Sequence, residues 1–441
     1  MSPSRTPLFT VRRRTALAAL TTAALAASLT ACGGGTGSDG GGTTVDYVSQ
    51  WNPQDPEAQV INKAITAFEK ANPGIKVKAT YAGRNNDAKI LNQIKARNAP
   101  DIVEGGTMRL KQFKLEPLDD LYAMKIPGET KTVGEVVPDG LKTLNTAEGK
   151  AYAAPYEYVV GGLWYQEKQL ASRGLKPPAQ WPEFTAQAAR FKADGQPLVQ
   201  QDGSVAGYNF FWFVNLVARY GGPDAMAKAA TDKSGEAWKG EVYQQAADQV
   251  RALTSAGALN KGYEGTTFPA AQNAWAQGKG GYALNFSWMP KETDKVRAAD
   301  AEIRYTPFPN VGGPGDDLVE ADTTSWVVPQ AAKHKDAAKK FLAHLYGKAT
   351  MQGFSDTAKT LTPRTDVTPP ALLADVTALL AKNPKVMPRL GNLERTAPAD
   401  YITKVVDPVY GDFFKSVGKQ STADFLDKLA KASKEFWATQ R

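Results

Sequence analysis

The residue types that support catalysis or metal binding are sparse in this chain. It has two histidines, His334 and His344, and one cysteine, Cys32. The histidines stand ten residues apart in one charged segment with no cysteine near them, so they do not make the ligand set that zinc requires. The G-x-S-x-G, P-loop and H-E-x-x-H motifs are absent from the sequence. We therefore expect no catalytic residue, no metal and no cofactor.

Adjacent carboxylates are the remaining candidates for catalysis. Asp119–Asp120 and Asp316–Asp317 are such pairs, and glycoside hydrolysis uses two carboxylic acids that face each other across a sugar. Neighbouring acids on a strand or loop usually point apart, and both pairs stand in turn-like sequence. The expected function is therefore binding, and a tethered secreted enzyme that cleaves glycans is the alternative.

The single cysteine stands at the end of an export signal. Basic residues, Arg5 and Arg12 to Arg14, precede an apolar run of small residues at 15–31, which is too short and too rich in alanine to span a membrane stably. The sequence Leu29-Thr30-Ala31-Cys32 resembles the lipobox of bacterial lipoproteins. That resemblance implies cleavage before Cys32 and a lipid on the new N-terminus.

The predicted signal peptide therefore covers residues 1–31, and a tether follows it. Residues 32–44 are mostly Gly, Ser and Thr, a composition typical of a flexible, lipid-anchored linker. Arg13 and Arg14 also fit a twin-arginine signal, so the export route stays open. The expected location is the extracellular face of the cytoplasmic membrane.

Composition argues against nucleic acid as a partner. The formal net charge is +8, and removal of the four arginines in residues 1–31 leaves +4. The remaining Lys and Arg residues are scattered among acids rather than gathered into a basic stripe. A mature length near 400 residues predicts two domains, and one cysteine allows no disulfide within the chain.

Apolar periodicity alternates between strand and helix in the first part of the mature chain. The pattern predicts strands at 45–48, 75–81 and 102–103, with helices at 56–68 and 90–94 between them. Such alternation is typical of an α/β fold with parallel strands covered by helices.

Three motifs in order identify a family resemblance. They are the runs FEKANPGIKV (68–77), APDIV (99–103) and LEPLDDL (115–121). Their order and spacing are similar to those of the extracellular solute-binding proteins of ABC importers, in the sugar-binding, maltose-binding-protein-like group. The resemblance extends over roughly residues 45–440, although Leu284 and Phe286 stand where that family usually has Met and Gly.

The resemblance implies a two-lobed periplasmic-binding-protein-like fold of type II, with a ligand cleft between the lobes. Segments 149–165, 307–328 and 361–364 look like the family's three crossovers and would form a hinge. The implied N-terminal lobe comprises 45–155 and 325–363, and the implied C-terminal lobe comprises 156–324 and 364–441.

Ligand contacts are expected at strand ends and crossovers, because open α/β sheets bind ligands beyond the carboxyl ends of their strands. A sugar pocket combines polar groups at its rim with aromatic rings as floor and lid. Trp288 matches the position of a stacking tryptophan in the family. The full set of predicted contacts is Trp51, Asn52, Arg84, Asn85, Asp87, Gly106, Thr107, Tyr156, Glu157, Phe211, Trp212, Trp288, Asp322, Thr323 and Arg364.

The resemblance implies a monomer that captures a sugar, expected to be an oligosaccharide, and delivers it to ABC permease subunits in the membrane. Three alternatives stay open: the glycan-processing enzyme, a sensor that presents bound sugar to a membrane kinase, and a binding protein for an acidic sugar or phosphodiester. The last would use arginines such as Arg84, Arg109 and Arg364, since a guanidinium binds an anion bidentately.

Overall fold

A mixed sheet joins distant parts of the chain. The computed structural model describes residues 42–83, 86–106, 114–382 and 384–440. Residues 1–41 lie outside this description, and with them the predicted signal peptide and Cys32. The strand order is β2 (Ile75–Tyr81), β1 (Thr43–Ser49), β3 (Ile102–Gly106), β9 (Val319–Val327), β6 (Ala154–Gln166) and β7 (Tyr282–Phe286). Two more strands join this sheet: β8 (Ile303–Thr306) pairs with β6, and β10 (Val386–Pro388) pairs with β9.

The sheet contains both parallel and antiparallel pairs, and β10 is parallel to β9. β1 is parallel to both β2 and β3, as predicted. β9 is antiparallel to β3 and to β6, and β7 and β8 are antiparallel to β6. A separate hairpin pairs β4 (Thr146–Ala147) with β5 (Lys150–Ala151). The α/β fold is therefore mixed, because long strands return through the sheet instead of extending its parallel part.

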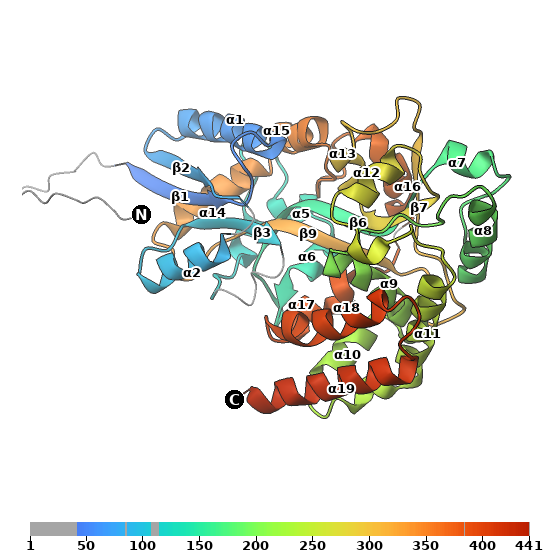
Figure 1. Cartoon of the computed structure of the whole chain (residues 1–441). Helices are drawn as coiled ribbons and strands as arrows, with labels where there is room; N and C mark the ends of the chain where they lie inside the picture. The colour runs from blue at the N-terminus through green and yellow to red at the C-terminus, as the bar shows by residue number, and fades with distance from the viewer. Residues whose placement is uncertain (1–41, 84–85, 107–113, 383, 441) are drawn as a thin grey trace, which may run out of the picture. The chain divides into compact units, whose positions relative to one another are not determined.

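Helices cover both ends of the sheet (Figure 1). Toward the end formed by β1 to β3 the helices are α1 (Pro56–Ala71), α2 (Asp87–Lys95), α4 (Asp119–Ala123), α5 (Val133–Val136), α14 (Lys335–Leu345) and α15 (Lys348–Gly353). Helix α6 (Asp139–Leu144) lies against β6 and β9. The others are α7 (Glu167–Ala171), α8 (Trp181–Ala193), α9 (Ala206–Gly221), α10 (Ala225–Thr231), α11 (Glu241–Ser255), α12 (Ala270–Ala276), α13 (Met289–Glu292), α16 (Ala374–Leu380), α17 (Leu393–Thr396), α18 (Asp407–Lys415) and α19 (Thr422–Thr439). Short 3-10 or π turns occupy Glu236–Lys239, Tyr263–Gly265, Phe354–Ala358, Ala371–Leu373, Arg389–Asn392 and Ile402–Val406.

Helix boundaries follow local chemistry. Pro56 opens α1, where its missing N–H costs no helical bond, and the Asn72-Pro73-Gly74 turn ends it, three residues beyond the predicted end at Phe68. The aromatic helix α9 stops at Gly222, whose φ of +85° favours glycine.

Buried apolar side chains gather into separate clusters at the two ends of the sheet. One large cluster contains Phe68, Trp326 and Phe341 and draws on residues 45–156 and 326–367. The other large cluster, around α9, α11, α18 and α19, draws on residues 159–318 and 387–436. Two separate cores are the arrangement expected of two lobes.

Three chain segments connect these cores side by side. Residues 154–160 of β6 pair with residues 321–326 of β9. On β6, the N–H of Tyr158 donates to the carbonyl of Leu361 at 3.0 Å. The segments expected to cross between the lobes are therefore hydrogen-bonded neighbours, as a shared hinge requires.

Candidate functional site

The crossing strands carry four of the predicted contact residues. Tyr156 and Glu157 lie on β6, and Asp322 and Thr323 lie on β9, where the register pairs Tyr158 with Thr323 and Val159 with Asp322. Tyr156, Glu157 and Thr323 are nearly inaccessible to solvent. The structure thus brings these residues together, and ligand contact through them stays a prediction.

Trp51 is held by a buried polar network at the ends of β1 and β3. Its indole Nε1–H donates to Glu104 Oε1 at 3.1 Å and to the Tyr156 hydroxyl at 2.9 Å. The Ser49 hydroxyl also donates to Glu104, and the Gln50 N–H reaches Glu104 Oε2 at 3.3 Å. The network fixes the orientation of the Trp51 ring, which is 8% exposed.

Glu104 is the residue on which this network depends, and sequence patterns did not single it out. Its side chain is fully buried, and burial raises its pKa, while the hydrogen bonds from Ser49, Tyr156 and Tyr47 lower it. A glutamate inside an apolar strand next to Gly105 and Gly106 is unusual, and that is the signal by which it could have been found.

Asp322 belongs to a network of compensated charges. Its Oδ2 lies 2.8 Å from Nε of Arg389, whose Nη2 donates to Glu394 Oε1 at 2.8 Å. On the same strand, Glu320 accepts from the Leu390 N–H and from Asn215 Nδ2, both at 2.8 Å. Burial raises the pKa of Glu320 to about 7 against these hydrogen bonds, which lower it.

The segment that contacts β9 has an unusual backbone. Leu390, Gly391 and Asn392 have consecutive φ angles of +54°, +61° and +68°. A left-handed leucine is strained, and the bond from its N–H to Glu320 helps to hold it. Sequence patterns predict neither this turn nor the roles of Arg389 and Glu394.

Thr323 is bonded into a neutral network. Its hydroxyl donates to Asn145 Oδ1 at 3.1 Å, and the Ser325 hydroxyl donates to the same oxygen at 3.0 Å. Asn145 follows α6, so this amide ties the second crossing to the segment that leads into β4 and β5.

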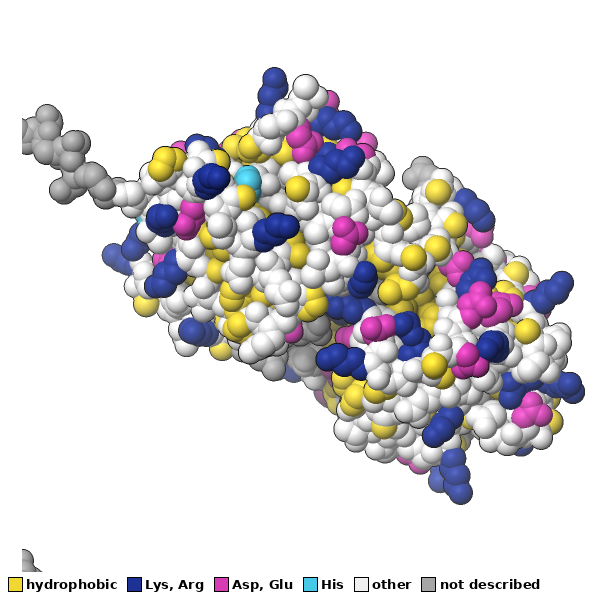
Figure 2. Space-filling model, turned by 90° about the horizontal axis from the view of Figure 1, so that it is seen from above, with side chains coloured by type: hydrophobic (Ala, Val, Ile, Leu, Met, Phe, Trp, Pro, Cys, Tyr) yellow, Lys and Arg dark blue, Asp and Glu magenta, His cyan; other side chains and the backbone are white. Residues whose placement is uncertain are grey.

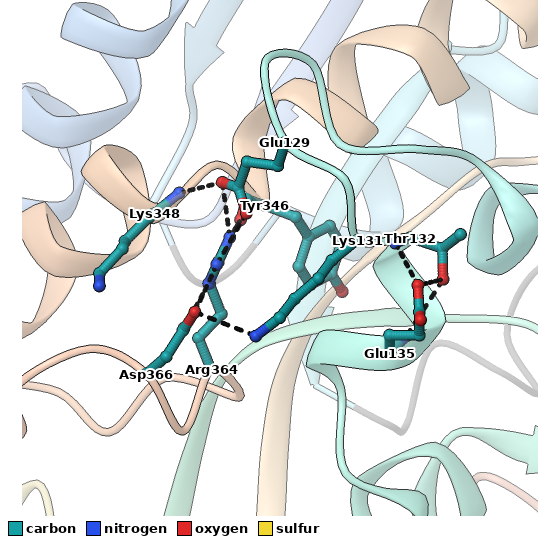
Figure 3. Close-up of polar contacts among 8 residues, drawn as sticks. All are labelled: Glu129, Lys131, Thr132, Glu135, Tyr346, Lys348, Arg364 and Asp366. Carbon is teal, nitrogen blue, oxygen red and sulfur yellow. Dashed lines mark hydrogen bonds and ion pairs between the residues drawn. The ribbon is translucent and has the colours of Figure 1, made fainter.

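Arg364 follows the third crossing and has all five N–H donors occupied (Figure 3). It donates twice to Glu129 and twice to Asp366, each at 2.8 Å, and once to the Tyr346 carbonyl at 2.9 Å. The guanidinium holds the pKa of Glu129 and of Asp366 below their usual values. Arg364 therefore has a structural role as a hydrogen-bonded ion-pair partner, and none of its N–H groups is left to bind an anionic ligand.

Trp288 lies just after β7. Its ring stacks on Phe286 with centroids 4.7 Å apart and planes 15° apart, so the phenylalanine that departs from the family pattern supports it. The Trp288 Nε1–H is shielded from solvent, and no hydrogen-bond partner lies near it in the part of the chain that the structure describes. Ring and donor together suit a sugar, which offers a flat C–H face and hydroxyl acceptors.

Phe211 and Trp212 lie inside the core. Trp212 is 0% exposed, and its Nε1–H donates to Gln201 Oε1 at 3.0 Å. Phe211 packs edge to face on Phe286 at 5.1 Å. Contact between a ligand and Trp212 would require this ring to leave the core.

The other predicted contacts are at loops and element ends. Asn52 donates through its backbone N–H and its Nδ2 to Asp55 Oδ2, at 2.8 and 3.2 Å. Asp87 begins α2, and Gly106 ends β3. Arg84, Asn85, Thr107 and Arg109 lie outside the described residues.

The residues considered for catalysis have structural partners. His334 Nδ1 lies 3.0 Å from Asp101 Oδ2, and His344 Nε2 lies 3.2 Å from the Ala64 carbonyl. Asp120 accepts from Lys339 at 2.7 Å, and Asp316 accepts from two backbone N–H groups.

Within ranges 42–83, 86–106, 114–382 and 384–440, no group of three His, Cys, Asp or Glu residues is placed to hold a metal. No helix in those ranges is long and apolar enough to cross a membrane.

A cavity of about 460 Å³ lies beside the third crossing. Tyr158, Leu361 and residues of α6 and α16 line it, together with several prolines and valines. Tyr158 is the one aromatic side chain in this lining, and Arg364 has no free donor to offer there. The hydroxyl residues Ser355, Thr362, Thr365 and Thr377 also line it, but it offers no second aromatic ring to stack on a sugar. The better candidate site therefore lies around Trp51, Trp288 and the crossing strands.

The fold is shared with solved sugar-binding proteins. The structure of a chitin oligosaccharide binding protein matches with a TM-score of 0.73 at 20% identity, covering 90% of this chain and 99% of that one. RafE in complex with raffinose matches with a TM-score of 0.69 at 20% identity, covering 89% and 99%. These likenesses define the class: a two-lobed solute-binding fold.

Sequence comparison gives the family. The chain matches the bacterial extracellular solute-binding proteins over residues 24–352, and it belongs to that family. The diacetylchitobiose binding protein DasA of Streptomyces coelicolor is 26% identical over 348 residues, which cover 75% of this chain and 77% of DasA. The putative ABC transporter periplasmic-binding protein YcjN of Escherichia coli is 27% identical, and the match covers 32% of this chain and 33% of YcjN. The predicted family and fold class are confirmed.

Proposed function

We propose that this chain captures a neutral oligosaccharide outside the cell and delivers it to an ABC permease. The observation that carries the proposal is the row of three hydrogen-bonded crossings between two separate cores. A shared hinge of this kind lets two lobes close on a ligand, and only groups that touch the ligand in the closed form drive closure. The proposed lobes are residues 45–155 with 325–363, and 156–324 with 364–441.

The charges near the crossings favour a neutral ligand. Arg389 forms ion pairs with Asp322 and Glu394. Arg364 forms ion pairs with Glu129 and Asp366. On the face shown in Figure 2, Lys and Arg side chains are interspersed with Asp and Glu rather than gathered in one basic patch. Relatives named for diacetylchitobiose, chitin oligosaccharide and raffinose support a short oligosaccharide as the ligand class.

A thermal-shift panel followed by calorimetry tests the ligand class. Raffinose, stachyose, diacetylchitobiose and galactose are compared with galacturonate as the acidic control. A ligand at a hundredfold excess over its Kd stabilises a protein by about 2.7 kcal/mol. We expect stabilisation by at least one neutral oligosaccharide, and stabilisation by galacturonate alone would overturn the neutral assignment.

The same samples separate binding from catalysis. We expect the bound sugar to be recovered unchanged by chromatography after long incubation. Cleaved glycan would support the tethered enzyme instead.

We also propose that a lipid on Cys32 holds the chain at the membrane. The support is the Leu29-Thr30-Ala31-Cys32 motif and the glycine-rich segment behind it. Lipid anchoring predicts that the chain fractionates with membranes and that Cys32→Ser releases it. Release of the unsubstituted chain into the medium would contradict the anchor.

A further inference from the structure

Lys291 and Glu57 form an ion pair between elements that belong to the two proposed lobes. Glu57 lies in the first turn of α1, and Lys291 lies in α13, 234 positions later in the chain. The Lys291 ammonium donates to Glu57 Oε1. Neither residue was singled out by the sequence motifs.

The burial of this pair is unequal. The Glu57 side chain is 1% exposed, whereas the Lys291 side chain is 26% exposed. Among the described residues, Lys291 is the one cation within 4.0 Å of the Glu57 carboxylate. Its ammonium also lies 5.6 Å from the centre of the Trp51 ring, within the range of a cation–π contact.

A buried carboxylate with one cationic partner makes closure depend on that partner. Apart, both groups are hydrated, and together they lose water and gain mutual attraction, so the intact pair is close to neutral in free energy. Removal of one partner is different, because the remaining charge would be buried without compensation. A chain without Lys291 would avoid that state by keeping α13 away from α1.

We propose that Lys291 and Glu57 form a latch between the lobes, and that closure brings the Lys291 ammonium against the Trp51 ring that Glu104 and Tyr156 already hold in place. This inference rests on the two-lobed binding function proposed above. Lys291 lies three residues after Trp288 on one short segment, and its ammonium lies 5.6 Å from the centre of the Trp51 ring, so this segment connects two of the predicted ring contacts.

Distances between spin labels test the latch without any ligand. In a chain carrying Cys32→Ser, Lys340→Cys on α14 and Lys261→Cys after α11 supply two exposed label sites, one on each proposed lobe. Electron–electron double resonance then compares four forms: the labelled chain, Lys291→Met, Glu57→Gln with Lys291→Met, and the control Lys295→Met, which removes an exposed lysine of the same segment.

We expect Lys291→Met to shift the distance distribution to longer values and Lys295→Met to leave it unchanged. The double variant has no buried charge, so its distribution should return at least halfway to that of the parent. Unchanged distances in Lys291→Met would overturn the latch, and so would equal shifts in the single and double variants, because the effect would then not come from an unpaired charge.

Raffinose titration supplies an independent readout. If the parent binds raffinose, Lys291→Met should weaken binding by roughly tenfold or more, because closure would bury Glu57 without its partner. An equal Kd would overturn the link between the latch and the ligand. If no carbohydrate in the panel binds the parent, the proposed function fails, and the spin-label distances still decide whether the latch exists.

Discussion

The indole N–H of Trp51 is shared between the carboxylate of Glu104 and the hydroxyl of Tyr156, at 3.1 and 2.9 Å. Both acceptors are fully buried, and Tyr156 stacks on Trp326 with centroids 4.4 Å apart. The Trp51 ring is therefore held by a strand end, a crossing strand and a packed aromatic pair. The orientation of the Trp51 ring is therefore fixed before a ligand binds.

Substitution of Glu104 should separate hydrogen bonding from charge. Glu104→Ala leaves the Ser49 hydroxyl, the Gln50 N–H and part of the Trp51 N–H without an acceptor, and should lower the free energy of unfolding by about 3 kcal/mol. Glu104→Gln keeps one carbonyl acceptor and should cost about 1 kcal/mol. Urea unfolding at pH 7 measures both. Equal losses in the two variants would contradict this prediction, because they would assign the whole effect to the carboxylate charge that both substitutions remove.

Arg364 should contribute to stability rather than to ligand affinity. Arg364→Lys cannot form two bidentate contacts, so Glu129 and Asp366 lose most of their bonds, and we expect a loss of about 3 kcal/mol in unfolding free energy at pH 7. The pKa values of both carboxylates are lowered in the fold, so the stability they provide is fully present above about pH 5 and is lost as the pH falls through the lowered pKa values. The unfolding free energies of the unsubstituted chain and of Arg364→Lys should therefore become equal in acid.

Lys131→Met is the matched control for Arg364. Lys131 lies 3.4 Å from the same Asp366 but is half exposed, so its removal should change stability by less than about 1 kcal/mol. A large loss of stability in Lys131→Met would contradict the structural role of Arg364. So would a loss of affinity in Arg364→Lys for the sugar that stabilises the chain in the thermal-shift panel, measured where the variant is fully folded.

Glu320 should make stability fall as the pH rises. Its pKa is about 7 in the fold and near 4.5 when unfolded, so the folded form holds a proton that the unfolded form has released. The resulting loss of unfolding free energy is absent below pH 4.5, grows between pH 4.5 and pH 7, and amounts to about 3 kcal/mol. Glu320→Gln should remove this slope, although its amide loses one of the bonds to Leu390 and Asn215.

Unfolding free energies at pH 4.5, 6 and 8 check that prediction. Glu264→Gln, which changes an exposed glutamate, should keep the slope of the unsubstituted chain. Parallel pH profiles for the chain and for Glu320→Gln would refute the raised pKa.

Local patterns predicted the elements well, because helix and strand periods, Pro56 and Gly222 act within a few residues. They did not predict pairs such as Glu57 with Lys291 or Trp51 with Glu104, which are 234 and 53 positions apart. No spacing rule relates residues so distant, and only the packed fold brings them together. The burial of Trp212 could have been foreseen, since residues 210–218 are apolar on every face but one, and such helices are buried.

Trp288 should determine ligand affinity through both its ring and its N–H. Trp288→Phe keeps a ring that can stack on Phe286 but removes the donor, and should weaken binding of the sugar that stabilises the chain in the thermal-shift panel about threefold to tenfold. Trp288→Ala also removes the stacking surface and should weaken binding further, by about tenfold or more in total. Calorimetry measures both Kd values. Trp437→Phe on α19 removes an N–H that already donates to the Ala230 carbonyl, so it should cost stability and leave affinity unchanged. If the unsubstituted chain, Trp288→Phe, Trp288→Ala and Trp437→Phe had equal Kd values, Trp288 would not contact the ligand, because removal of a contacting ring lowers affinity.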